Sequence, residues 1–356
     1  MNILILTRYE NLGASSRIRS YRYFPWFTNA GFKITTNYLV NDTQLCMRYQ
    51  KNKYSLFDFL KNYWQRIRIL MSRRNFDLVW IEKEALPWFP VWFERILLRG
   101  VPYVLDFDDA IFHNYDLHSS AWIRWIYGRR IDRLMAGARL VIAGNFYLAQ
   151  RAHNAGASWV EIVPTVIDLD RYMAKPASVL SGEPLRIVWI GSPSTTRYLK
   201  LLQEPFAILS QRFFFRFIII GGDKVDLPGM DVEFVQWSEA TEVALIQACD
   251  IGVMPLSDSP WEQGKCGYKL IQYMACGLPV IASPVGVNTE IIRVGENGFL
   301  ANSVQEWVDA LTRLLSDADL RQQMGRLGRQ YVIEKYTFQL LAPRMVNLLR
   351  SAAEGS

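Results

Sequence analysis

The chain has 356 residues, of which 50% are hydrophobic and 13% aromatic, so it is too apolar for a disordered protein and long enough for two domains. Its four cysteines form no CxxC pair and its three histidines show no metal-ligand spacing, so neither a disulfide scaffold nor a bound metal is expected. The net charge of +6 is moderate, and without a run of 18 apolar residues we expect no membrane-spanning helix.

The N-terminus, MNILILTRYENLG, is a short apolar run followed by a polar loop. It lacks the basic start and longer apolar core of a signal peptide, so we expect a cytoplasmic protein. Similar apolar runs recur along the chain and predict strands. In the first half these are Asn2–Leu6, Lys33–Tyr38, Leu78–Ile81, Tyr103–Leu105, Leu140–Ala143 and Glu161–Val163. In the second half they are Arg186–Ile190, Phe215–Ile220, Val232–Phe234, Ile251–Met254, Pro279–Ala282 and Gly298–Leu300.

Helical stretches between most of these strands indicate parallel sheets of the α/β class. The proline-punctuated string Ala174–Pro184 is the best linker, and the strand–helix pattern restarts after it. We therefore predict a first Rossmann-like domain at 1–175 and a second at 183–336, doubly wound and facing each other across a cleft. A terminal helix at about 337–356 is expected to pack back on the first domain.

In the first half, LGASSRIRSYRYFP follows the first strand. Gly13 and Ser15 are small enough to let a ligand pass close, and Arg17 and Arg19 are suited to binding phosphate or a carboxylate. The alternative is a solvated basic helix.

Acidic residues end two neighbouring strands of the first half. VLDFDDAIFH places Asp106, Asp108 and Asp109 at the end of one strand, and IEKEALP places Lys83 and Glu84 at the end of another. Buried aspartates without partners would cost stability, so a functional cluster is plausible, with Asp108 or Asp109 orienting an acceptor or acting as a base. An internal ion pair between Lys83 and an aspartate is the structural alternative.

Basic, aromatic segments also distinguish the first half. Between Arg48 and Arg74 there are eight lysines and arginines but one acid, Asp58, and PWFPVWFERILLRG and AWIRWIYGRRIDRL have the same character. Such a surface suits anionic lipid headgroups and a lipid-linked acceptor. The alternative is that the helices bury their aromatic residues on the sheet. Nucleic acid is not expected, because no reader motif accompanies these residues.

Small and hydroxyl-bearing residues follow the strands of the second half. In the first half, Asn145 follows the strand Leu140–Ala143 and is a possible hydrogen-bonding residue of the cleft wall. WIGSPSTTRYLKLL is a strand, a loop and a helix whose start suits phosphate or simple N-capping. Gly221 should line the cleft, and Trp237 is placed either to stack on a base or to lie in the core or rim. The loop residues expected to bind phosphate are Gly191, Ser192, Thr195 and Thr196.

The most specific stretch is KCGYKLIQYMACGLPVIASPVG, residues 265–286. A loop that enters a helix offers free N–H groups and the positive end of a dipole to a sugar phosphate. Gly267 lets the backbone approach the ligand, and Lys265 and Lys269 supply positive charge to a diphosphate leaving group. The alternative is that both lysines are ordinary solvated residues.

This stretch resembles the donor-binding signature of GT-B glycosyltransferases, specifically glycosyltransferase family 4, most strongly from Gly267 to Gly286. The family has two glutamates separated by seven residues, with Phe-Gly between them. Aligned on Cys266-Gly267, this chain has Gly264 and Gln272 at those positions, and Glu262 lies two residues away. Gln272 retains an amide able to bond ribose, and a loop shift would let Glu262 bind the sugar.

The resemblance implies a GT-B fold and transfer of a sugar from a nucleotide-diphosphate donor with retention and without metal or other cofactor. The acceptor would be a growing cell-surface glycan or a lipid-linked acceptor, reached at the inner face of the membrane. Two alternatives stay open: a non-catalytic nucleotide-sugar-binding subunit of a polysaccharide assembly complex, and a GT-B-like phosphorylase or epimerase.

Overall fold

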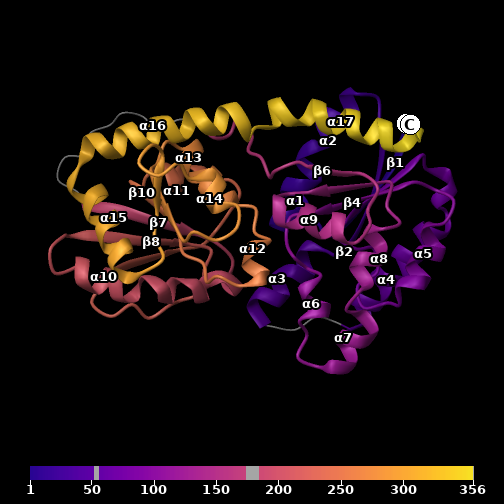
Figure 1. Ribbon diagram of the computed structural model, residues 1–356, viewed down its shortest axis with the longest axis horizontal. Helices are drawn as coiled ribbons and strands as arrows, with labels where there is room; N and C mark the ends of the chain where they lie inside the picture. The colour runs from indigo at the N-terminus through magenta and orange to yellow at the C-terminus, as the bar shows by residue number, and fades with distance from the viewer. Residues whose placement is uncertain (52–55, 174–183, 356) are drawn as a thin grey trace. The chain divides into compact units, whose positions relative to one another are not determined.

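The computed structural model describes residues 1–51, 56–173 and 184–355 (Figure 1). These divide into two compact units. The first comprises Met1–Thr165, Gln263–Cys266 and Leu341–Ser356, and the second comprises Val166–Glu262 and Gly267–Leu340. The predicted linker Ala174–Pro184 lies almost entirely outside the described residues.

The first unit is built on a six-stranded parallel sheet of order β2-β1-β3-β4-β5-β6. Its strands are β1 Asn2–Tyr9, β2 Lys33–Val40, β3 Leu78–Glu82, β4 Tyr103–Phe107, β5 Leu140–Ala143 and β6 Val160–Ile162. Its helices are α1 Ala14–Arg19, η1 Tyr21–Tyr23, α2 Phe24–Asn29, α3 Asp42–Lys51, α4 Leu56–Met71, η2 Arg73–Asn75, α5 Val91–Leu98, α6 His113–Asp116, α7 Ala121–Tyr127, α8 Arg130–Met135 and α9 Phe146–Asn154.

The winding of this sheet reverses between β1 and β3, which are neighbours although β2 lies between them in sequence. Ligands of open parallel sheets bind beyond the carboxyl ends of the strands at such a reversal. The register places the ends of the central strands level with one another, because Leu6 pairs with Ile81 and Glu82 pairs with Asp106. The loops after β1, β3 and β4 therefore meet at one edge of the sheet.

The second unit has a six-stranded parallel sheet of order β12-β11-β10-β7-β8-β9, with its reversal between β7 and β10. Its strands are β7 Leu185–Ile190, β8 Phe215–Ile220, β9 Asp231–Val235, β10 Ile251–Met254, β11 Val280–Ala282 and β12 Gly298–Leu300. The remaining helices of the chain are η3 Pro193–Leu202, α10 Gln203–Leu209, α11 Glu242–Gln247, α12 Pro260–Gln263, α13 Tyr268–Ala275, α14 Asn288–Ile291, α15 Val304–Ser316, α16 Ala318–Lys335 and α17 Phe338–Glu354.

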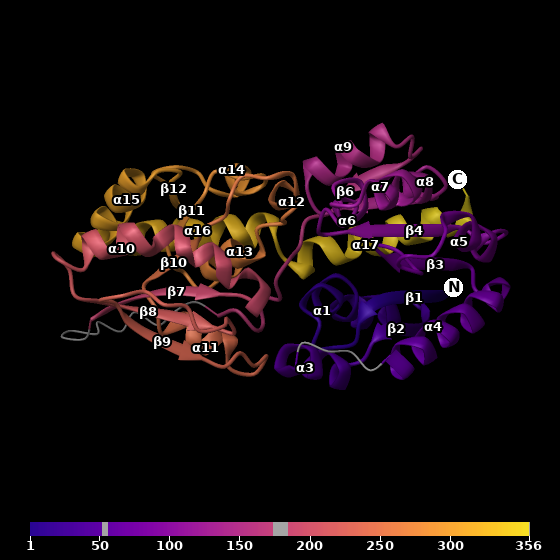
Figure 2. The same ribbon diagram turned by 90° about the horizontal axis from the view of Figure 1, so that it is seen from below.

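Figure 2 shows this second sheet from below, and its central strands are buried on both faces. Successive residues of a strand point to opposite faces. Accordingly, Trp189 of β7 packs into a core with α10 and α15, and its neighbour Val188 packs into another with α13 and the end of α16. A sheet covered on both faces needs near-continuous apolar strands, which explains sequences such as FRFIII in β8.

The predicted fold class is confirmed: the chain forms two doubly wound parallel α/β sheets. One strand differs from prediction in an informative way. The predicted strand ends at Leu105, just before the charged Asp106, whereas β4 continues to Phe107. The extension is possible because the buried Asp106 carboxylate is paired with Arg19. Among the described residues, no helix has the length and hydrophobicity needed to cross a membrane.

Candidate functional site

Five side chains meet beyond the carboxyl ends of β1, β3 and β4 in the first unit. We call them the lysine–aspartate cluster: Ser15, Lys83, Asp108, Asp109 and Lys265. Ser15 lies in α1 after β1, Lys83 follows β3, and the two aspartates follow β4. Lys265 comes from the short segment Gln263–Cys266 that belongs to this unit. The reversal of the sheet thus gathers residues that are far apart in sequence.

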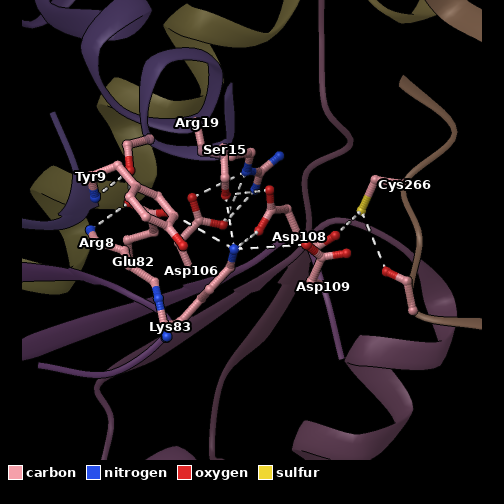
Figure 3. Close-up of polar contacts among 12 residues, drawn as sticks. Arg8, Tyr9, Ser15, Arg19, Glu82, Lys83, Asp106, Asp108, Asp109 and Cys266 are labelled. Carbon is pink, nitrogen blue, oxygen red and sulfur yellow. Dashed lines mark hydrogen bonds and ion pairs between the residues drawn. The ribbon is translucent and has the colours of Figure 1, made fainter. Parts of the chain in front are cut away.

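Lys83 is the centre of the cluster (Figure 3). Its Nζ lies 2.8 Å from Asp108 Oδ1 and 3.8 Å from Asp109 Oδ2, and it donates a hydrogen bond of 2.9 Å to Ser15 Oγ. Ser15 in turn donates to Asp108 Oδ2 at 2.5 Å. The internal ion pair considered for Lys83 is therefore present. Asp109 also forms an ion pair with Lys265, whose Nζ lies 2.7 Å from Asp109 Oδ1.

The backbone of Lys83 has a φ of 67°, in the left-handed region that lysine rarely adopts. Its N–H donates to the carbonyl of Asp106 at 2.8 Å, so the chain is still bonded to β4 where it turns out of the sheet. Backbone strain of this kind persists where the surroundings enforce it, commonly at functional sites. Here it accompanies a buried ammonium group that lies beside Asp108 and Asp109.

Asp108 and Lys83 both stay ionised at neutral pH. Burial raises the pKa of Asp108, but the Lys83 ammonium and the Ser15 hydroxyl outweigh burial and bring that pKa to about 2. Burial lowers the pKa of Lys83, and the carboxylates of Asp108, Asp109 and Glu82 outweigh it, so this pKa lies well above the ordinary value. Asp108 is therefore a weak base. Asp109 is the more exposed carboxylate, at 26% against 14% for Asp108.

The low pKa of Asp108 predicts a loss of stability in acid. A carboxyl group with an ordinary pKa of 3.8 when unfolded and about 2 when folded stabilises the folded state above pH 3.8, and this contribution disappears as the pH falls through 2. It amounts to about 2 kcal/mol. Urea unfolding at a series of pH values should show the stability advantage of the natural protein over Asp108→Asn shrinking by that amount in acid. A constant difference would contradict the assignment.

Other predicted residues of the first unit have internal partners. Arg19 is 1% exposed and pairs with Asp106 at 2.6 Å, and Arg17 is also buried and donates to the carbonyls of Asn11 and Leu12. The alternative of a solvated basic helix is therefore wrong. Glu84 accepts hydrogen bonds from Tyr115. Burial raises the pKa of Glu84, and the opposing effect of Arg130 and Arg8 does not outweigh it.

Glycines are required where the backbone is crowded. A Cβ at Gly13 would lie 2.2 Å from Cβ of Tyr9, so the loop after β1 packs on its own strand. A Cβ at Gly264 would lie 2.7 Å from the backbone nitrogen of Ala110. A side chain at position 264 therefore has no room without a shift of the backbone at Ala110.

The segment Gln263–Cys266 is held by the first unit. Asn145 caps α9 by accepting from the N–H of Leu148, and its Nδ2 donates to the carbonyl of Lys265 at 2.9 Å. The Cys266 thiol donates to the carbonyl of Asp108 at 3.2 Å, and burial raises the pKa of this thiol. Asn145 and Cys266 thus position Lys265 beside Asp109.

In the second unit, small residues follow β7 and β8 at the reversal of the sheet. A Cβ at Gly191 would lie 2.4 Å from the ring of Trp189, and Gly221 has a φ of 77° with its Cβ position 2.7 Å from the carbonyl of Gly191. Ser192 precedes η3, and Thr195 Oγ1 donates to its carbonyl. Thr196 Oγ1 accepts the N–H of Asp223 and so joins the two loops.

Gly267 and Lys269 lie at the start of α13. Gly267 has a φ of 65°, and a Cβ there would lie 2.3 Å from Cδ1 of Ile291. Lys269 Nζ lies 5.4 Å from the centroid of the Trp189 ring, a cation–π contact that brings its charge to the end of β7. Lys269 and the Gly191 loop thus lie beside the same strand end.

A buried chain of hydrogen bonds includes two predicted residues. Gln272 Nε2 donates to the hydroxyl of Tyr172 at 2.7 Å, and Tyr172 donates to Glu242 at 3.1 Å. Trp237, half-buried at the edge of the core, donates to the other oxygen of Glu242 at 2.8 Å. Sequence reasoning did not single out Tyr172 or Glu242, because nothing local marks partners that lie 100 and 30 residues from Gln272.

Glu262 is 3% exposed and fully engaged. Its carboxylate accepts from the hydroxyls of Tyr198 and Ser259, and lies 3.2 Å from Arg197. Burial raises the pKa of Glu262, but the hydroxyl donors and Arg197 outweigh it and lower this pKa overall. Sequence reasoning missed Tyr198 and Ser259. Across the described residues, no group of three or more histidine, cysteine or acidic side chains is placed to hold a metal ion.

Comparison with known proteins supports the resemblance for the second unit. The family model described as "Glycosyl transferases group 1" matches residues 184–317. The D-inositol 3-phosphate glycosyltransferase of Corynebacterium urealyticum is 32% identical over 111 residues, which cover 31% of this chain and 25% of that protein. The match thus spans about a quarter of the relative's length.

Solved structures with the same fold cover the whole chain. Sucrose-phosphate synthase of Thermosynechococcus elongatus aligns with a TM-score of 0.75 and 16% identity, covering 100% of both chains. The Anabaena protein HepE, solved in complex with UDP, aligns with a TM-score of 0.74 and 17% identity, covering 99% of this chain and 100% of that one. At these identities the likeness establishes the fold.

Proposed function

We propose that this protein is a glycosyltransferase of the GT-B type similar to family 4, which moves a sugar from a nucleotide-diphosphate donor to an acceptor. The observation that carries the proposal is the convergence at one strand end of the Gly191 loop, Gly221 and Lys269. Close backbone approach and a nearby cation are what a pyrophosphate requires. The group 1 glycosyl transferase match spans these same residues, and HepE binds UDP.

In this proposal the donor's pyrophosphate lies against Ser192, Thr195 and the start of η3. The bond between the anomeric carbon and the phosphate oxygen breaks, the nucleoside diphosphate leaves with that electron pair, and the acceptor oxygen forms the new bond. Lys269 stabilises the negative charge of the leaving group. Retention and independence of metal are the expectations of the family resemblance.

The lysine–aspartate cluster serves the acceptor in this proposal. The acceptor hydroxyl must lose a proton as it attacks, and an efficient base has a pKa near the working pH. Because the pKa of Asp108 is held at about 2, we assign it to orienting the acceptor and Lys83. Asp109 is assigned as the base because it is the more exposed of the two carboxylates and so the more accessible to an acceptor hydroxyl.

The acceptor class in this proposal is a growing cell-surface glycan carried on a lipid, reached at the inner face of the cell membrane. A screen of thermal stabilisation with UDP, UDP-glucose, UDP-N-acetylglucosamine and GDP-mannose tests donor binding, because a ligand of the folded state raises the unfolding temperature. Stabilisation by a nucleotide sugar is expected. Failure of every nucleotide and nucleotide sugar to stabilise the protein would overturn the proposal.

Replacing Lys269 by alanine is expected to weaken binding of the stabilising nucleotide sugar by about 1–3 kcal/mol, the scale of a charged hydrogen bond. Calorimetric titration measures the affinity. Lys335→Ala is the matched control, because Lys335 Nζ also lies 5.5 Å from an aromatic centroid, that of Tyr331, but at the end of α16. Equal affinities for the two variants would refute the role of Lys269.

A further inference from the structure

Several large apolar side chains of the first unit point to solvent instead of covering the sheet. Trp122 and Trp125 of α7 are 73% and 78% exposed, and Ile126 on the same helix is 51% exposed. Trp88 and Trp92, just before and within α5, are 45% and 61% exposed. We call these five residues the tryptophan face. The alternative that these basic helices bury their aromatic residues is wrong for these side chains.

Aromatic contacts hold the tryptophan face together. The rings of Trp122 and Trp125 lie 5.9 Å apart and nearly perpendicular. Trp88 has a φ of 65° and lies 6.1 Å from the ring of Tyr127, which joins the loop before α5 to α7. None of the α7 residues is buried, and Figure 1 shows α7 at the margin of the first unit, farther from the sheet than α6 and α8.

The exposed charges on the two helices of the tryptophan face have one sign. In α5, α7 and the residues that directly follow them, the exposed charged side chains are Arg95, Arg99, Arg124 and Arg129. The acid of α5, Glu94, is completely buried and paired with Arg130. Exposed indole rings beside arginines match the boundary of an anionic bilayer, where the rings insert among headgroups and the guanidinium groups pair with phosphates.

We propose that α7 and the tryptophan face dock this protein on an anionic lipid surface. The inference deepens the proposed function, since a lipid-carried acceptor places the enzyme at a membrane, and it commits to a bilayer as the occupant. A second copy of the chain would bring arginines against arginines. A single-stranded nucleic acid would need rings spaced for stacking on bases, whereas Trp122 and Trp125 pack edge to face on each other.

Vesicle co-sedimentation of the full chain tests the proposal. The natural protein is expected to bind phosphatidylcholine vesicles containing about 30% phosphatidylglycerol and to bind much less to phosphatidylcholine alone. Raising the salt from about 50 to 500 mM should weaken binding several-fold. Trp122→Ala with Trp125→Ala should lower the partition coefficient by about tenfold or more, and Arg129→Gln by about fivefold.

Phe214→Ala is the matched control, because Phe214 is 76% exposed and has an arginine two residues away on either side but lies in the second unit. It is expected to bind vesicles like the natural protein. Equal binding by the double tryptophan variant would overturn the proposal, as would vesicle binding independent of salt and of phosphatidylglycerol. So would an effect of that variant confined to self-association in light scattering or to binding of an oligonucleotide.

The variant is also tested for thermal stabilisation by the nucleotide-sugar panel. Donor stabilisation without vesicle binding would remove the docking inference and leave the transferase proposal standing. Vesicle binding without stabilisation by any nucleotide sugar would remove the transferase proposal and leave the docking inference standing.

Discussion

Replacing Asp109 by asparagine is expected to lower the turnover number by roughly 10²–10⁴-fold, the usual contribution of a positioned general base. Asparagine keeps the size of the side chain and cannot take a proton from the acceptor hydroxyl. The measurement is release of nucleoside diphosphate from the donor identified by thermal stabilisation, in the presence of a lipid extract that contains the acceptor. Donor affinity should be unchanged, because the residues assigned to the pyrophosphate in the proposal, Ser192, Thr195 and Lys269, lie in the second unit.

Asp116→Asn is the control for this experiment. Asp116 is likewise partly exposed, at 21%, and paired with a cation, Arg151, but it lies outside the lysine–aspartate cluster. It should keep near-normal turnover. If Asp109→Asn also keeps it, the base assignment is wrong. If Asp108→Asn shows the larger loss, the two aspartates have exchanged the roles proposed here.

Replacing Lys83 by methionine is expected to destabilise the first unit by about 3–5 kcal/mol. Methionine fills much of the same space but leaves the Asp108 carboxylate, which is 14% exposed, without its cation. It also removes the positive charge that offsets the repulsion among the carboxylates of Glu82, Asp108 and Asp109. The stability is measured by urea unfolding at neutral pH. A loss below about 1 kcal/mol would mean that the ion pair is dispensable.

Two further variants separate the buried pair from its exposed neighbour. Lys265→Met breaks an ion pair of similar length, 2.7 Å, between side chains that are 23% and 26% exposed, and should cost no more than about 1 kcal/mol. Lys83→Met combined with Asp108→Asn removes both charges of the buried pair and should recover part of the stability lost by Lys83→Met alone. A double variant less stable than either single variant would contradict the pairing.

The strands were predictable because a sheet covered by helices on both faces requires apolar residues at nearly every strand position. Each predicted strand overlaps an observed one, since apolar runs such as FRFIII and LVIA admit few other structures. The extension of β4 through Asp106 was not predictable, because a charge normally ends a buried strand. Its partner Arg19 lies 87 residues away and is known only from the fold.

The meeting of Ser15, Lys83 and the aspartates was foreseeable from strand order, because the carboxyl ends of parallel strands meet at one edge. The place of Lys265 was not. Its sequence neighbours from Gly267 onward belong to the second unit, while Lys265 itself belongs to the first and binds Asp109. The contact between Tyr198 and Glu262 also escaped prediction, because the two lie 64 residues apart and no local pattern pairs them.

The first unit includes residues from the C-terminal part of the chain, so it cannot be obtained whole as an N-terminal fragment. Arg350 of α17 donates to the carbonyl of Ala30 at 2.7 Å and lies over the ring of Phe32, while Arg344 pairs with Glu161 at 2.6 Å. A fragment that stops at Thr165 would leave the carbonyl of Ala30, the ring of Phe32 and the carboxylate of Glu161 without these arginine partners, and it would lack Lys265. Anyone wishing to study the amino-terminal sheet in isolation should therefore supply residues 341–356 as a fused or added peptide.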